Sequence, residues 1–536
     1  KVWVPSSSAA PCMTWGQPCD TPYGRLAPPS PLANLPFLRP TAPPALAAPS
    51  CRRAPELWPA MRSCSGVMGS TVAEVYDRIG LGRYQWRLFI TAGLGFAADS
   101  IETNLLALLS AETSREWPNA GYAGSLLSSS VFAGELVGCF IWGPVADKVG
   151  RKKAFVLSNV MLIGFGLASA AAPSLEWFAA LRFLVGMGVG GSAVPFDLLC
   201  ESVSGDAMVR FAFAIELFWT AGTLYINALA VLMLDSLGWR WLAGLSTAPI
   251  IFGVIGSFWL LESPVWLCAK GRHEQATEVL QRVAHLNGVD VGTFVLTTHR
   301  SPEAPLSALF GRQLRPRSLL LAFIWVVGLF GYFGASFATP KIFDTSAGVN
   351  YGEVLFSSSG EVLGLLVCMA VTLRMGVLVG LAGSYFWAAA MCLALLPVAT
   401  APVPYLVGIT FLCRAGVMGG TSATWLATTA AFPTSVRSSA HGFLNAGGRI
   451  GGLLSTLLPK SLPGVVGFSL FAGANMGCAV AAAILRYLLR DEMGRGVDME
   501  RAGAASEAST VMAPDQFPSG SSGGEPEVLL LAERHF

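Results

Sequence analysis

The chain has 536 residues, and its 35 Lys and Arg nearly balance its 33 Asp and Glu, for a net charge of +2. This balance excludes a nucleic-acid-binding protein that depends on bulk positive charge. Only 13% of residues are charged, against roughly 25% in soluble domains. Hydrophobic residues make up 53%, and the mean hydropathy is +0.56. This composition excludes a soluble globular protein and indicates a polytopic membrane protein.

The N-terminal segment, residues 1–70, is expected to be disordered. Residues 1–60 hold 14 of the 33 prolines and only two acids, Asp20 and Glu56, with no helical or strand period. Such a segment cannot build a core. Because the sequence starts with Lys1, the segment is either part of a fragment or a translation upstream of a start at Met61 or Met68. A transit peptide is the functional alternative.

Twelve apolar segments of membrane length follow, near 86–110, 120–141, 153–173, 176–200, 211–234, 239–261, 318–338, 353–373, 375–396, 402–430, 440–459 and 465–489. Backbone groups in hydrocarbon must bond within their own segment, so each is predicted to be a helix. The fold class is therefore an all-α membrane protein of twelve transmembrane helices. Its two six-helix halves are residues 71–261 and 318–490, separated by a polar linker, 262–317.

Charge in the loops predicts the orientation. Fourteen Lys and Arg lie in the linker and the other loops on its side, whereas the opposite loops hold only Arg115, Arg240, Lys341 and Lys460. By the positive-inside rule, both termini and the linker are expected to be cytosolic.

Two polar segments complete the chain. Within the linker, Ala276, Val279, Leu280, Val283 and Leu286 recur at helical spacing, which predicts an amphipathic helix against the bundle or the membrane surface. Residues 491–536 are predicted to be a disordered tail. In this tail, Glu525 followed four residues later by Leu529 and Leu530 resembles an acidic dileucine sorting signal of endosomal and vacuolar membrane proteins. The location is expected to be the plasma membrane or an endosomal or vacuolar membrane.

The loop between the second and third segments carries the most specific motif, Gly143-Pro-Val-Ala-Asp147-Lys148-Val-Gly150-Arg151-Lys152-Lys153. Glycines permit close helix packing and a tight turn, and Asp147 can hold a neighbouring Arg. This string resembles the signature loop of the major facilitator superfamily, G-x-x-x-D-[RK]-x-G-R-[RK]-[RK], at every defined position. The resemblance implies the major facilitator fold and a transport function.

Further strings resemble the same superfamily: Arg182-Phe-Leu-Val-Gly186-Met-Gly188-Val-Gly190-Gly191, Glu262-Ser-Pro264-Val-Trp266-Leu267, Phe432-Pro433-Thr434-Ser-Val-Arg437, and Ala98-Asp99-Ser-Ile-Glu102. The second and third are similar to sugar-porter-like members, and the last is similar to the synaptic-vesicle-two-related branch. The second half departs from the pattern, because Leu373 stands where the signature has Asp, Val377 and Leu378 replace its basic run, and Ala430 replaces the glutamate before Phe432.

Charged side chains inside the spans predict the functional site, because each costs roughly 2.5–3.5 kcal/mol at the bilayer centre. Asp99 and Glu102 share a helix face, and two close carboxylates raise each other's proton affinity. They are the leading candidates for substrate or proton binding, with a structural pair as the alternative. Arg182 and Arg414 occupy matching positions in the two halves and are either substrate or gating groups or snorkelling anchors.

Other polar residues are assigned by position. Asp147, Arg151, Asp197, Glu201 and Arg437 lie near the cytosolic ends and are expected to form a gate. The remaining charged or titratable residues within the spans are expected to make helix–helix hydrogen bonds; they are Glu135, Glu216, Glu361, His441 and Arg449.

The sequence therefore predicts a secondary active transporter of a small organic or inorganic solute, working by alternating access and coupled to protons. A facilitative uniporter and a non-transporting sensor of a vesicle membrane are the alternatives, and the altered second-half loop favours the latter. No nucleophile and base, no metal-ligand or disulfide spacing among the 11 cysteines, and no nucleotide-binding motif is found, so we expect no enzyme and no cofactor. The partners are expected to be the solute, protons and lipid, and the chain a monomer.

Overall fold

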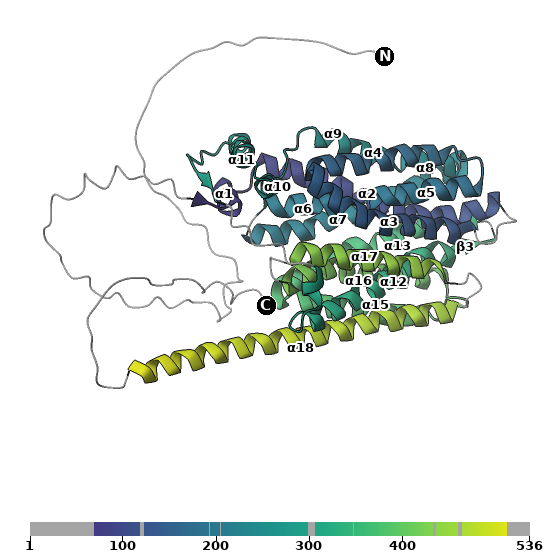
Figure 1. The fold of residues 1–536 in the computed structure, drawn as a ribbon. Helices are drawn as coiled ribbons and strands as arrows, with labels where there is room; N and C mark the ends of the chain where they lie inside the picture. Colours follow the sequence, from purple (N-terminus) through teal and green to yellow (C-terminus); the bar gives the residue numbers. More distant parts are fainter. Residues whose placement is uncertain are drawn as a thin grey trace, which may run out of the picture. The chain divides into compact units, whose positions relative to one another are not determined.

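The structure is a computed structural model, and it describes residues 69–117, 123–191, 193–203, 205–297, 306–346, 348–432, 436–458 and 464–511. Nearly all of these residues are helical (Figure 1). Most of the predicted disordered segments, residues 1–68 and 512–536 with the dileucine string, lie outside the described residues.

The first half contains nine helices: α1 (Val72–Ile79), α2 (Arg83–Glu116), α3 (Ala123–Val149), α4 (Arg151–Ala170), α5 (Leu175–Val189), α6 (Ala193–Ser202), α7 (Gly205–Leu237), α8 (Trp239–Leu245) and α9 (Ala248–Ser257). Six membrane spans result, because α5 with α6 and α8 with α9 each form one interrupted span. The linker holds α10 (Pro264–Ala269), α11 (His273–Asn287) and a 3-10 turn, η2 (Leu306–Phe310).

The second half contains α12 (Arg315–Ile342), α13 (Tyr351–Ser358), α14 (Gly360–Met375), α15 (Val377–Ala394), α16 (Val403–Ala431), α17 (Arg437–Thr456) and α18 (Gly464–Val511). Here α13 and α14 form one span, so this half also has six. Two short strands, β3 (Asp344–Thr345) and β4 (Gly348–Val349), form an antiparallel pair between α12 and α13. The twelve-helix architecture predicted from the sequence is confirmed.

Nine helices in the described part of the chain are long and apolar enough to cross a membrane by length and composition alone. The other three spans are α2, α8 with α9, and α17. Charged residues along α2 and the break between α8 and α9 weaken the apolar signal of the first two. In α17 it is weakened by polar residues such as His441, Asn445 and Arg449.

Glycines bring the helices of each half into backbone contact. A Cβ added to Gly134 of α3 would lie 2.0 Å from the Phe183 carbonyl oxygen of α5, and one added to Gly360 of α14 would lie 2.1 Å from the Phe411 carbonyl oxygen of α16. These are the second and fourth spans of each half, so the close crossing repeats in both. Any larger residue would separate the helices.

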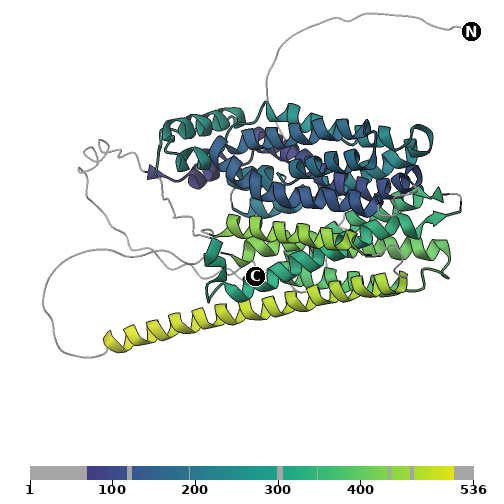
Figure 2. The ribbon, with the colours of Figure 1, turned by 45° about the vertical axis from the view of Figure 1, so that its right-hand side comes forward.

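The linker packs on the first half. Ala276, Leu280 and Val283 of α11 are buried, and α11 contacts α1, α2 and α10, so the predicted amphipathic helix exists and lies against the protein. A short strand before α1, β1 (Gly69–Ser70), pairs in parallel with β2 (Val295–Leu296) of the linker. We call the helix ends beside α1, α10 and α11 the linker end, and the opposite ends the far end (Figures 1 and 2).

The last helix is longer than expected. The apolar segment predicted a span to residue 489, followed by a tail from 491, but α18 continues to Val511. The intervening stretch is rich in Ala, Glu, Arg and Met, which are strong helix formers, and it lacks proline. The apolar part of α18 that could cross a membrane ends at Arg490, and the helix itself continues beyond it.

The predicted orientation can be tested by labelling. Glu274 is exposed on α11 and Thr400 is exposed in the loop between α15 and α16. With the linker in the cytosol, an impermeant maleimide should label Thr400→Cys in intact cells and should label Glu274→Cys only after permeabilisation. The unsubstituted chain controls for native cysteines. Labelling of both variants in intact cells contradicts the topology.

Candidate functional site

Three buried arginines lie among the central helices, each paired with acids from other helices. Arg182 of α5 is fully buried and forms an ion pair with Glu102 of α2. It also donates a hydrogen bond to the Ser169 hydroxyl at 2.7 Å. Glu102 accepts a second hydrogen bond, from Ser246, at 3.0 Å. A buried charge is tolerated only when it is paired and hydrogen-bonded, and this pair meets both conditions.

Arg449 of α17 joins the two halves. Its guanidinium forms a two-point ion pair with the Asp99 carboxylate of α2, one contact being 3.0 Å, and contacts Glu135 of α3 at 3.0 Å. All three side chains are at most 3% exposed. One guanidinium therefore holds two carboxylates from the other half.

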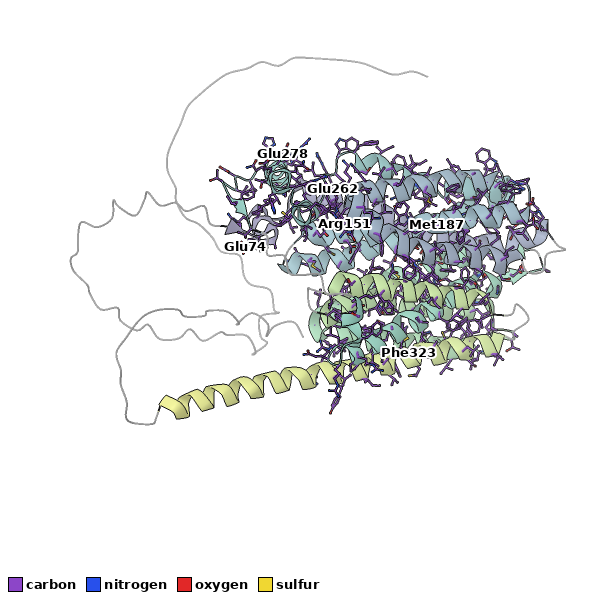
Figure 3. All side chains as sticks on the ribbon, in the orientation of Figure 1. Glu74, Arg151, Met187, Glu262, Glu278 and Phe323 are labelled. Carbon is purple, nitrogen blue, oxygen red and sulfur yellow. The ribbon has the colours of Figure 1, made fainter. Side chains whose placement is uncertain are left out.

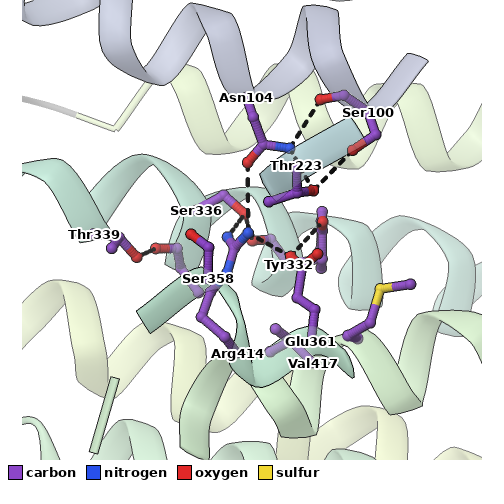
Figure 4. Close-up of polar contacts among 12 residues, drawn as sticks. Ser100, Asn104, Thr223, Tyr332, Ser336, Thr339, Ser358, Glu361, Arg414 and Val417 are labelled. Carbon is purple, nitrogen blue, oxygen red and sulfur yellow. Dashed lines mark hydrogen bonds and ion pairs between the residues drawn. The ribbon is translucent and has the colours of Figure 1, made fainter. Parts of the chain in front are cut away.

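Arg414 of α16 is the second-half counterpart of Arg182. It pairs with Glu361 of α14 and donates to the Ser336 hydroxyl of α12 (Figure 4). Tyr332 donates a 2.9 Å hydrogen bond to Glu361, and the side-chain oxygen of Asn104 lies 3.5 Å from Arg414. Because Asn104 belongs to α2, this network also crosses between the halves.

The sequence predicted the charged residues but not their partners. Asp99 and Glu102 share one helix, yet each binds a different guanidinium, which differs from the expected mutually coupled pair. Arg182 and Arg414 are buried, so the snorkelling alternative is wrong. Glu135, Glu361 and Arg449 make the expected helix–helix contacts, but as ion pairs at the centre of the site. The glycines that flank Arg449 were the sequence feature that could have predicted its central position, because they place it at a close helix crossing.

Polar contacts connect the halves toward the far end. Tyr351 of α13 bonds Glu112 of α2 at 2.9 Å, and Asn227 of α7 bonds Ser358 of α13 at 3.2 Å. The Ser129 hydroxyl of α3 lies 2.9 Å from that of Thr456 on α17. These contacts join the two halves at this end.

An aromatic cluster lies on the linker side of the site and joins four helices besides α2. The Trp425 ring of α16 contacts Phe96 of α2, Phe196 of α6, Trp325 of α12 and His441 of α17, with centroid distances between 4.9 and 5.7 Å. Trp325 also donates a 2.9 Å hydrogen bond to Thr428. Sequence reasoning missed this cluster, because aromatic residues within apolar spans carry no positional signal.

Several residues that were predicted to form a gate lie together at the linker end. Arg151 contacts Asp147 at 3.0 Å and Glu201 at 3.7 Å, and Asp197 lies near enough to interact with it electrostatically. Arg151 and Glu262 lie at the same end of the helices (Figure 3). Arg437 begins α17, but its side chain lies outside the described residues.

The turn of the signature loop is built by Gly150, whose φ of +110° suits glycine. Gly376 repeats this turn with a φ of +93° in the second half. The acid is not repeated, since Leu373 at the corresponding place is 60% exposed. No group of His, Cys, Asp and Glu in the described ranges is arranged to hold a metal ion.

Twelve spans in two halves around a buried ionic layer define a membrane transporter of the major facilitator fold. The chain belongs to the family described as sugar (and other) transporter, whose model matches residues 100–491.

Several relatives and solved structures resemble the chain. The synaptic vesicle 2-related protein of Bos taurus is 29% identical over 450 residues, covering 80% of this chain and 82% of that protein. The organic cation/carnitine transporter 7 of Arabidopsis thaliana is 29% identical over 444 residues, covering 73% of this chain and 88% of that protein.

Among solved structures, the proton:xylose symporter XylE bound to 6-bromo-6-deoxy-D-glucose aligns with a TM-score of 0.59 at 14% identity, covering 74% of this chain and 94% of that one. The inward-open conformation of the xylose transporter XylE from E. coli aligns with a TM-score of 0.57 at 14% identity, covering 75% of this chain and 96% of that one. At these identities the likeness shows the fold alone. The matching family and the Arabidopsis relative are named as transporters, which agrees with the prediction from the sequence that the chain is not an enzyme.

Removal of Arg449 should destabilise the protein strongly. Arg449→Ala leaves Asp99 and Glu135 buried without their guanidinium, and breaking such a network costs about 3–5 kcal/mol. We expect a large fall in the thermal midpoint in detergent, measured by fluorescence-detected size exclusion. Arg374→Ala, at an exposed arginine, is the control and should have little effect. Equal midpoints for both variants would contradict the importance of the Arg449 network.

Proposed function

We propose that the chain is a secondary active transporter that moves a small solute by alternating access and is driven by a proton gradient. The observation that carries the proposal is the arrangement of two closures on either side of the buried ionic layer. Polar contacts hold the halves together toward the far end, and the Trp425 cluster holds them on the linker side. The site then opens to one side of the membrane when one closure separates and the other stays formed.

The ion pairs fit a rocking motion. Arg182 with Glu102 lies wholly within the first half, and Arg414 with Glu361 lies wholly within the second. These pairs move with their own halves, and their polar atoms are the candidates for contacting solute. Arg449, in contrast, crosses between the halves, so its contacts with Asp99 and Glu135 must change as the halves rotate.

Proton coupling is supported by the excess of buried acids. The central described helices hold the carboxyl groups of Asp99, Glu102, Glu135, Glu216 and Glu361 against three guanidinium groups. Excess negative charge in a low dielectric favours proton uptake. A membrane potential of 100 mV then contributes roughly 2.3 kcal/mol for each elementary charge that moves.

The membrane and orientation belong to the same proposal. The linker end is assigned to the cytosol, and the membrane to the plasma membrane or an endosomal or vacuolar membrane. The name of the synaptic vesicle 2-related relative is compatible with a vesicle membrane. The exposed Leu373 in place of an acid is the observation that favours the second candidate, a non-transporting sensor.

Uptake into proteoliposomes with an internal pH dye tests the proposal. The probes are D-xylose, named for the structural neighbour, and carnitine, named for a relative. We expect one probe, or another solute in a wider panel, to enter and to acidify the lumen in step with its uptake. Solute entry without acidification supports a uniporter, and solute binding without entry supports a sensor.

Alternating access predicts that a cross-link between the halves stops transport. The side-chain oxygens of Ser129 and Thr456 are 2.9 Å apart, which places two cysteines within reach of a disulfide. Ser129→Cys with Thr456→Cys should lose uptake after oxidation and recover it after reduction. Each single variant should be insensitive to the oxidant. Full uptake by the cross-linked protein contradicts alternating access.

A further inference from the structure

One buried acid of the central helices stands apart from the others. Asp99, Glu102, Glu135 and Glu361 all contact a guanidinium. Glu216 of α7 is only 4% exposed, yet within the described part of the chain it forms no ion pair with Lys, Arg or His. A carboxylate buried without a cation is costly, so the neutral acid is the stable form unless water or a cation reaches it.

The surroundings of Glu216 supply hydroxyl groups. Ser422 of α16, in the other half, is fully buried, and its hydroxyl has no hydrogen-bond partner among the described residues. Thr220, one turn along α7 and therefore on the same face, is 1% exposed, and its hydroxyl has no hydrogen-bond partner among the described residues. A neutral carboxyl group can donate its O–H to such a hydroxyl oxygen, whereas an ionised one can only accept.

The charges around Glu216 also favour the protonated acid. The helices packed against α7 are α2, α8, α13, α14 and α16. Their charged side chains nearest the centre are Asp99, Glu102, Glu361 and Arg414, while Arg240 and Glu353 lie near the far end. Three of these four central groups are acids, which carry the same sign as an ionised Glu216. Arg414 is already engaged by Glu361.

We propose that Glu216, rather than Asp99 or Glu102, is the acid that takes up and releases the coupling proton. Glu102 and Glu361 gain from staying ionised, because protonation of either would leave a buried guanidinium without its acid, and Asp99 makes the two-point contact with Arg449. Glu135 makes a single contact with Arg449, which it shares with Asp99. Glu216 has no such constraint. When the halves separate along the boundary between α7 and α16, water reaches its carboxyl group and the proton can leave to that side.

The claim that the proton on Glu216 is coupled to transport rests on the proposed function. The protonation of Glu216 itself can be measured without any solute. Infrared difference spectra of the full-length protein in lipid should show the carbonyl band of a buried protonated carboxyl group at neutral pH. This band should disappear at alkaline pH, and it should be absent from Glu216→Gln. In the matched control Glu353→Gln, a substitution on α13 away from the centre, the band should remain. A band that persists unchanged in Glu216→Gln overturns the proposal.

Transport assays distinguish a failure of the proposed proton coupling from a failure of the proposed role of Glu216. Glu216→Gln mimics the protonated acid, so it should still exchange labelled solute across the membrane while it loses solute-driven acidification of the lumen. Wild-type uptake without acidification means that proton coupling itself is wrong, whatever the infrared result. If the wild type acidifies the lumen and Glu216→Gln does so equally, coupling stands and the role of Glu216 is overturned.

Discussion

The rest of the structure depends on the pairing of buried charge between helices. Arg182, Arg414 and Arg449 lie where an isolated cation would be unstable, so each fixes the position of the acids around it. Arg182 binds the first and fourth spans together, and Arg414 does the same for the eighth and tenth. Arg449 is different, because it ties the eleventh span to the first and second and thereby holds one half against the other.

The two halves share a backbone plan and differ in their polar chemistry. Glycine crossings join the second and fourth spans in both halves, and Gly150 and Gly376 make the same turn. Arg182 finds its acid on the first span of its half. On the corresponding seventh span, Arg414 contacts the Ser336 hydroxyl and the Tyr332 ring, and it takes its acid, Glu361, from the eighth span. Backbone packing is therefore preserved while the charges have been redistributed.

The closures on either side of the ionic layer differ in kind. Toward the far end, hydroxyl, amide and carboxyl groups bond directly between the halves, and such contacts have defined partners and distances. On the linker side, the Trp425 cluster relies on ring contacts, which depend less on precise geometry. Rings can slide and repack as the halves rotate, whereas hydrogen bonds must break.

The sequence alone determined the membrane class, the twelve spans, the linker helix and the signature turn at Gly150, because apolar length, helical spacing and glycine positions act locally. Only the tertiary structure decided the partners of the charges. Arg182 and Glu102 are 80 positions apart, and Arg449 and Asp99 are 350 apart. Asp99 and Glu102 looked like a pair because they share a helix face. Packing turned them toward different arginines and left Glu216 without one, and no local pattern records that outcome.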